Sequence, residues 1–264
     1  MHIARYALDE CVHYGIIENE GSIARLESSP LEGLKRSGAI DSLAAVRLLA
    51  PIEQPRVFGL GYNYVAHSHE VGKAVPQRPV LFMKPSTSVI GPDASIVYPD
   101  DGQNIHFEGE LTVVIGRKAR HVSAADALDH VLGYTCGNDV SDRVLQRRES
   151  EFGCLLAGKG YDTFAPMGPV IATGLDPSRI GIVTRVNGAV RQNGTTADLL
   201  FSVPEIIAYL SRYMTLLPGD MIMTGTPAGV GPIQVGDTIE VEIEGIGILR
   251  NGVVAEDRGS APRG

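Results

Sequence analysis

The sequence predicts a β-rich α+β fold with a small N-terminal α/β unit. Short apolar runs rich in β-branched residues recur along the 264-residue chain. Glycine (31 residues) and proline (16 residues) are plentiful enough to supply the turns between such strands. Helical patterns are few, and they do not alternate with the strands as they would in a parallel βαβ fold.

The chain is expected to divide into three parts: a small N-terminal domain (residues 1–54), a main domain (55–254) and a frayed tail (255–264). In the first part, residues 14–17 and 22–26 read as two short strands around a polar turn. Periodicity does not decide whether residues 43–49 form a short helix or a strand. Pro51 and Pro55 mark the linker to the main domain.

The main domain reads as strands with few helices. The expected strands are residues 56–60, 95–98, 111–115, 182–186, 220–223 and 238–243. Asn187-Gly188 is typical of a hairpin turn. One helix is expected over residues 124–132, after Ser123 as a candidate N-cap. A second is expected over residues 203–213, with Pro204 in the first turn, where proline is tolerated.

Charge and cysteine content exclude several classes of protein. The net charge of −8 argues against a nucleic-acid-binding protein, although a bound cation can attract an anionic substrate locally. Three widely spaced cysteines indicate a reducing compartment rather than a disulfide framework. The sequence has neither an apolar signal core at its start nor a run of ~20 apolar residues, so we expect a cytoplasmic protein without membrane contact.

Two glutamates one residue apart suggest a metal site. Glu108 and Glu110 open the apolar run 111–115, and residues i and i+2 of a strand share a face. Like charges held this close favour a cation between them, whereas the alternative is the solvated face of an antiparallel sheet. Asp139 follows another apolar run and adds a third carboxylate. Carboxylates without nearby Cys or His ligands predict Mg²⁺ over zinc, with Mn²⁺ and Ca²⁺ as alternatives.

A histidine–glutamate pair suggests acid–base chemistry. His67 and Glu70 are three residues apart, so on a helical turn they would share a face and touch. A carboxylate beside an imidazole fixes its tautomer and raises its basicity, which makes a general base. The alternative is a chance pair on a surface turn. His69 lies off that face and is expected to be exposed or hydrogen-bonded.

Further candidates lie later in the chain. Lys159 stands between glycines, which are expected to let the backbone approach a ligand closely. Arg143 and Gln146 could grip an anionic substrate, or could belong to a solvated helix face. The glycine-rich segment 223–231 could offer hydroxyl and N–H donors to a carboxylate, or could be an ordinary tight loop.

Taken in order, these motifs resemble the fumarylacetoacetate hydrolase family over residues 55–252. The motifs are Tyr62-Asn63-Tyr64, His67-x-x-Glu70, Lys84-Pro85, Glu108-x-Glu110, Asn138-Asp139-x-Ser141-x-Arg143-x-x-Gln146, Lys159-Gly160-x-Asp162-Thr163-Phe164 and Thr224-Gly225-Thr226-Pro227-x-Gly229-Val230-Gly231. One departure is the absence of the tryptophan that family members commonly carry before the lysine, in the segment 151–157.

The resemblance implies a mixed β-roll core with the metal at its mouth, and a homodimer. It implies that the metal ligands are Glu108, Glu110 and Asp139. It implies that His67 and Glu70 form a catalytic dyad, often on a segment that closes over substrate. The remaining implied site residues, which contact substrate or stabilise its charge, are Tyr62, Arg143, Gln146, Lys159 and Thr226.

The expected activity is metal-dependent hydrolysis of a C–C bond in a small anionic 2-oxo acid, a 2,4-dioxo acid of the acylpyruvate type, through a metal-bound pyruvate enolate. His67 would deprotonate water, and Lys159 and Gln146 would stabilise the oxyanion. Alternatives on the same site are decarboxylation of an oxaloacetate-type substrate and isomerisation or tautomerisation of an unsaturated 2-oxo diacid. A more remote alternative is a non-catalytic module that binds a dicarboxylate.

Overall fold

The protein is built on a large mixed sheet, seen in a computed structural model that describes residues 1–19 and 21–257. Its strand order is β4-β3-β2-β1-β14-β12-β11-β17-β6-β7, with β5 beside β1 and β8 beside β14. The strands are β1 (His2–Leu8), β2 (Cys11–Asn19), β3 (Ser22–Leu26), β4 (Arg36–Ser42), β5 (Arg47–Leu48), β6 (Val57–Gly61), β7 (Val80–Lys84), β8 (Val89–Ile90), β11 (Gly109–Ile115), β12 (Val131–Asn138), β14 (Ala165–Ala172) and β17 (Met221–Met223). The pairs β17–β6 and β14–β8 are parallel, and the other pairs of this sheet are antiparallel.

Two smaller sheets complete the body. One has the order β16-β15-β19-β20-β9, made of β9 (Ile96–Tyr98), β15 (Gly181–Val186), β16 (Ala189–Thr195), β19 (Thr238–Ile243) and β20 (Gly247–Ala255). The other has the order β13-β10-β18, made of β10 (Ile105–Phe107), β13 (Ser141–Asp142) and β18 (Gly231–Pro232). The β-rich α+β fold is therefore confirmed.

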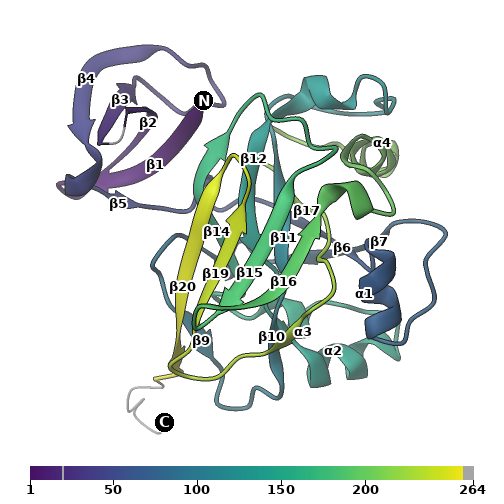
Figure 1. Ribbon diagram of the computed structural model, residues 1–264. Helices are drawn as coiled ribbons and strands as arrows, with labels where there is room; N and C mark the ends of the chain where they lie inside the picture. Colours follow the sequence, from purple (N-terminus) through teal and green to yellow (C-terminus); the bar gives the residue numbers. More distant parts are fainter. Residues whose placement is uncertain (20, 258–264) are drawn as a thin grey trace, which may run out of the picture.

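The large sheet packs against the sheet of β15, β19 and β20, as Figure 1 shows. Strand β11 lies in the large sheet and is buried along its whole length. Leu111 and Val113 belong to one hydrophobic cluster and Val114 to another, so both faces of β11 are covered. A strand covered on both faces reads as a continuous apolar run, which is how residues 111–115 appear in the sequence.

Helices are few and short. They are α1 (Val65–Glu70), α2 (Arg143–Ser150), α3 (Ala157–Gly160) and α4 (Val203–Tyr213), besides 3₁₀ turns at Leu43–Ala45, Ser86–Ser88, Ala127–His130 and Thr196–Asp198. The expected helix 203–213 is confirmed, and a capping box between Ser202 and Glu205 begins it. The expected helix 124–132 is wrong: the chain makes only a 3₁₀ turn before it enters the buried strand β12 at Val131. In the described residues, no helix is both long and apolar enough to span a membrane.

The N-terminal strands lie at one side of the body, opposite α1, α2 and α3 (Figure 1). In the described residues this part contains strands and one 3₁₀ turn but no α-helix, so the predicted α/β character of the N-terminal unit is wrong. The undecided stretch 43–49 holds both that turn and β5. Strand β1 continues the large sheet, because His2 pairs with Ala172 and Ile3 with Ile171 of β14. Of the tail predicted to be frayed, Ala255 still pairs with Tyr98, while residues 258–264 lie outside the described part.

Candidate active site

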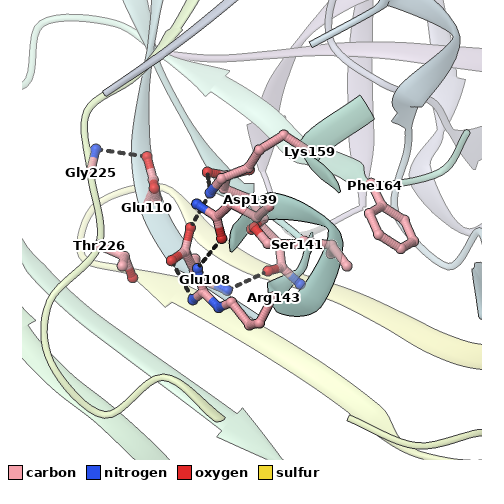
Figure 2. Close-up of polar contacts among 12 residues, drawn as sticks. Glu108, Glu110, Asp139, Ser141, Arg143, Lys159, Phe164, Gly225 and Thr226 are labelled. Carbon is pink, nitrogen blue, oxygen red and sulfur yellow. Dashed lines mark hydrogen bonds and ion pairs between the residues drawn. The ribbon is translucent and has the colours of Figure 1, made fainter. Parts of the chain in front are cut away.

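Three buried carboxylates meet where β11 and β12 run side by side. Glu110 is the second residue of β11, Glu108 lies between β10 and β11, and Asp139 directly follows β12. Each has a carboxylate oxygen within 4.8 Å of those of the other two, and each residue is at most 4% exposed. Figure 2 shows the three side chains converging. The predicted side-by-side placement of Glu108 and Glu110 is therefore confirmed, and Asp139 joins them.

Gly109 accounts for the spacing of the two glutamates. Its N–H donates to Gln192 Oε1 at 2.9 Å. A Cβ at this position would lie 2.1 Å from Thr184 Oγ1 on β15. At Gly109 the backbone therefore packs directly against β15, while the side chains of Glu108 and Glu110 point to the opposite face.

We expect Gly109→Ala to destabilise the protein by about 1–3 kcal/mol, because an added methyl group overpacks this contact. Gly252→Ala is the matched control, since a Cβ there meets nothing within 4 Å. Urea denaturation measures both variants. Equal denaturation midpoints for the two would contradict the packing role of Gly109.

Charge is distributed unevenly among the three carboxylates. Burial alone would raise the pKa of Glu108, but Arg143, Lys159 and His67 outweigh it and hold that pKa well below its usual range. Arg143 Nη2 donates to Glu108 Oε1 at 2.6 Å, and Lys159 Nζ donates to Oε2 at 2.7 Å. Burial, with Asp139 and Glu108 nearby, raises the pKa of Glu110 well above its usual range. Glu110 Oε2 accepts a hydrogen bond from the N–H of Gly225 at 2.7 Å.

The carboxylate cluster fits a hard divalent cation. Its donor atoms are all oxygens, which Mg²⁺, Mn²⁺ and Ca²⁺ prefer. Lys159 Nζ donates to Asp139 Oδ2, and the buried Asp139 Oδ1 lies 2.7 Å from Lys84 Nζ, a contact that does not have the geometry of a hydrogen bond. A cation would offset the repulsion that raises the pKa of Glu110. The cluster could thus hold such an ion through Glu108, Glu110 and Asp139.

The histidine–glutamate pair forms on α1 as the sequence predicts. His67 Nδ1 and Glu70 Oε2 are 3.1 Å apart, and Glu70 Oε1 accepts from the N–H of Gly229 at 2.9 Å. A carboxylate only accepts hydrogen bonds, so Nδ1 carries a proton, and in the neutral imidazole Nε2 keeps its lone pair. His67 is 4% exposed, and its Nε2 lies 3.7 Å from Glu108 Oε1. His69 is exposed on the same helix.

Helix α2 brings Arg143 and Gln146 to the carboxylates. Asp142 caps this helix by accepting from the N–H groups of Val144 and Leu145. Arg143 Nη1 donates to Gln146 Oε1 at 3.0 Å, which leaves the amide hydrogens of Gln146 free to donate elsewhere. The sequence left open whether Arg143 lies at a binding site or on a solvated helix face. The solvated position is wrong, because the second guanidinium nitrogen of Arg143 donates to Glu108.

The glycines beside Lys159 serve chain packing rather than approach to a ligand, which corrects the sequence interpretation. A Cβ on Gly158 would lie 2.6 Å from the Gln146 backbone nitrogen, and one on Gly160 would lie 3.0 Å from Pro85. Helix α3 therefore packs against α2. This packing directs Lys159, which is 3% exposed, toward Glu108 and Asp139 (Figure 2).

The glycine-rich loop gives its donors to the protein's own groups. The N–H groups of Gly225 and Gly229 donate to Glu110 and Glu70, two of the protein's own carboxylates. The Thr226 hydroxyl donates to Gly109 O at 2.9 Å and accepts from Gln192 Nε2 at 2.7 Å. Its proton is thus already bound, so any contact of Thr226 with substrate would use its second lone pair or its methyl group.

A cavity of about 390 Å³ opens over the cluster. The predicted site residues that line it are Tyr62, His67, Glu70, Glu108, Glu110, Arg143, Gln146, Lys159 and Thr226. Asp139 lies behind this lining, against Lys84. In the segment without the family's tryptophan, Leu155 lines the cavity and Phe152 is 89% exposed. Burial, with the charge of Arg143, lowers the pKa of the cavity-lining His106 to about 4, so this imidazole is neutral at pH 7.

Sequence reasoning missed two residues that organise the site. Lys84 Nζ lies 2.7 Å from Asp139 Oδ1, and its only sequence signal was its place in a family motif. Gln192 forms hydrogen bonds with Gly109, Thr226 and Pro227, although it lies on β16 in the sheet of β15, β19 and β20. No local pattern marks Gln192, because its partners come from distant parts of the chain.

Comparison with known proteins places the chain in a family. Residues 56–254 match the family described as fumarylacetoacetate (FAA) hydrolase C-terminal, and residues 1–51 match one described as Rv2993c-like, N-terminal. A 5-carboxymethyl-2-hydroxymuconate delta-isomerase from Mycobacterium smegmatis is 45% identical, with a TM-score of 0.91 over 97% of this chain and 100% of that one.

Two further relatives carry different activities. A fumarylpyruvate hydrolase from Pseudomonas aeruginosa, in complex with Mn²⁺ and pyruvate, is 36% identical, with a TM-score of 0.74 over 80% of this chain and 92% of that one. A mitochondrial oxaloacetate tautomerase from Homo sapiens is 42% identical over 79% of this chain and 70% of its own length. The chain therefore belongs to the fumarylacetoacetate hydrolase family of enzymes, whose members include hydrolases, isomerases and tautomerases.

Proposed function

We propose that this enzyme is a divalent-metal-dependent hydrolase that cleaves a C–C bond of a 2,4-dioxo acid. The observation that carries the proposal is the His67–Glu70 pair, whose imidazole Nε2 lies 3.7 Å from Glu108 Oε1. A general base thus lies beside the carboxylates that would hold the cation. We propose Mg²⁺ as that cation, with Mn²⁺ as the alternative that the Pseudomonas aeruginosa relative contains.

The metal, bound by Glu108, Glu110 and Asp139, would act as a Lewis acid toward the 2-oxo acid end of the substrate. His67 would take a proton from water through Nε2, while Glu70 keeps Nδ1 protonated. The resulting hydroxide would attack the 4-oxo carbon. The C3–C4 bond would then break, and C3 would take up a proton.

Two side chains have hydrogens left for the oxyanion at C4. Lys159 Nζ gives hydrogen bonds to Glu108 and Asp139, and an ammonium has a third hydrogen. Arg143 donates to the Gln146 oxygen, and within the described part of the chain no protein group binds the Gln146 amide nitrogen. Each such donor is worth about 3–4 kcal/mol in a preorganised site.

Unpaired positive charges at the cavity support a substrate with a second carboxylate. Lys73, after α1, and Arg147, on α2, both line the cavity and are exposed. In residues 1–19 and 21–257, neither side chain forms an ion pair or hydrogen bond with a protein group. We infer that they attract an anionic group at the far end of the acyl chain.

Arg147→Gln is therefore expected to raise KM about 3–5-fold for an acylpyruvate whose acyl group ends in a carboxylate, as exposed ion pairs are worth up to ~1 kcal/mol. KM for acetylpyruvate, which lacks that group, should not change. Arg148→Gln is the matched control, because Arg148 is the next residue of α2 but lines a different, smaller hollow. Equal effects on both substrates would contradict this role of Arg147.

A second candidate is tautomerisation or decarboxylation of oxaloacetate. The similarity to the human oxaloacetate tautomerase favours it, and His67 could move a proton between C3 and the 2-oxo oxygen without attack by water. The cavity of about 390 Å³ falls in the range of pockets that enclose ligands larger than a four-carbon acid, which favours a longer substrate than oxaloacetate.

Proton NMR in D₂O on acylpyruvates, oxaloacetate and unsaturated 2-oxo diacids tests the proposal. Hydrolysis yields pyruvate and the acid of the acyl group. Tautomerisation exchanges the C3 protons without pyruvate, and decarboxylation yields pyruvate from oxaloacetate. Turnover of oxaloacetate or a 2-oxo diacid without cleavage of any acylpyruvate would overturn the hydrolase assignment.

A further inference from the structure

Lys84, the last residue of β7, is buried behind the carboxylate cluster. Its side chain is 0% exposed. Its Nζ donates to the backbone carbonyls of Val140 at 2.9 Å, Lys159 at 2.6 Å and Phe164 at 2.8 Å. All three carbonyls are distant in sequence from β7, so the single ammonium of Lys84 connects β7 to the chain around the carboxylate cluster.

A fourth oxygen lies beside the same nitrogen. Asp139 Oδ1 is 2.7 Å from Lys84 Nζ, yet no hydrogen bond reaches this oxygen among the described residues. An ammonium has three hydrogens, and the three carbonyls take them. Lys84 therefore balances the charge of Asp139, and Oδ1 keeps a lone pair for another partner.

Burial of an ammonium is unfavourable unless nearby groups compensate for it. A role in folding alone would be met by the three carbonyls, whose hydrogen bonds already use the hydrogens of Lys84. One contact goes beyond that role, the carboxylate of Asp139. In addition, one of the three carbonyls belongs to Lys159, whose own Nζ binds Glu108 and Asp139.

We propose that Lys84 is a positioning residue for the metal site. It holds the Asp139 carboxylate and the Lys159 main chain in place, and it thereby sets the affinity of the cluster for a divalent cation. The inference rests on the proposed metal dependence. Residues that orient metal ligands without touching the ion typically change its affinity by about 10–100-fold when replaced.

The test is the replacement Lys84→Met, which keeps the length of the side chain and removes its charge. Mn²⁺ and Mg²⁺ are titrated into chelator-treated protein by calorimetry, and folding is checked by circular dichroism. We expect the variant to bind Mn²⁺ about 10–100-fold more weakly than the parent protein.

Arg56→Met is the matched control. Arg56 forms a bidentate pair with the buried Asp220, which lies beside Ile115 at the opposite end of β11 from Glu110. This variant should lose stability and keep its metal affinity. Unchanged affinity in a folded Lys84→Met protein would overturn the proposal.

Other outcomes separate this inference from the proposed function. If the parent protein itself binds neither ion, the metal dependence fails, and the inference about Lys84 falls with it. If Lys84→Met does not fold, Lys84→Gln takes its place, because its amide retains N–H donors for the carbonyls. Unfolding of both variants beside a folded Arg56→Met control would assign Lys84 to folding alone and overturn the positioning role.

Discussion

His67→Asn is expected to lower kcat for acylpyruvate cleavage by about 10²–10⁴-fold, the usual contribution of a general base. The imidazole is buried, Glu70 fixes its tautomer, and Nε2 faces the carboxylate cluster. The affinity for Mg²⁺ should stay within a few-fold of that of the parent protein, because His67 is not among the groups that would hold the ion. Steady-state kinetics and metal titration measure the two effects separately.

His69→Asn is the control, since His69 is exposed on the same helical turn and does not line the cavity. It should retain full activity. A His67→Asn enzyme with unchanged kcat would remove His67 from the mechanism. Retained decarboxylation of oxaloacetate by that variant would mean that this second reaction needs no base at position 67.

Glu110→Gln is expected to weaken Mg²⁺ binding by more than the ~10–100-fold that outer-shell substitutions produce, because it removes a ligand charge. Turnover should fall with metal occupancy, as it should when EDTA is added to the parent enzyme. Without metal, the variant should be no less stable than the parent. The reason is that the substitution preserves shape and relieves repulsion among carboxylates that burial makes strong.

Denaturation with and without Mg²⁺ tests this prediction. The parent should gain about 2.7 kcal/mol of unfolding free energy when Mg²⁺ is at 100 times its Kd, and the variant should gain far less. Glu240→Gln, on β19 of the other sheet, should behave like the parent. Equal stabilisation of parent and Glu110→Gln by Mg²⁺ would exclude Glu110 as a ligand, and activity indifferent to EDTA would exclude the metal.

Local signals in the sequence predicted the elements whose structure is decided locally. Helix α4 has its capping residues and Pro204 in the chain itself, and β19 alternates buried and half-buried residues over its full length. Strand β14 was missed because Pro166 and Pro169 argue against a central strand. The prediction of a helix at 124–132 is wrong because the chain from Val131 onward forms β12, which pairs with β11 and β14 in the large sheet.

In the candidate site, too, some residues could be predicted from local spacing and others could not. Glu108, Glu110 and the His67–Glu70 pair could be predicted from their spacing over a few residues, and the structure brings them together with Asp139. The roles of Lys84 and Gln192 depend on contacts between β7 or β16 and distant segments. The steric reason for Gly109 also lies in another sheet, where Thr184 meets it. These contacts form only when the sheets pack together, so no local sequence pattern predicts them.

The pairing of β1 with β14 predicts how a truncated form of this protein would behave. A chain begun at residue 55 would leave Ile171 and Ala172 with unsatisfied ladder groups, because His2 and Ile3 now pair with them. An uncovered strand edge rich in apolar residues recruits other chains. A shortened version that keeps every catalytic candidate would therefore be prone to aggregate, and low solubility in such a fragment should not be read as a defect of the active site.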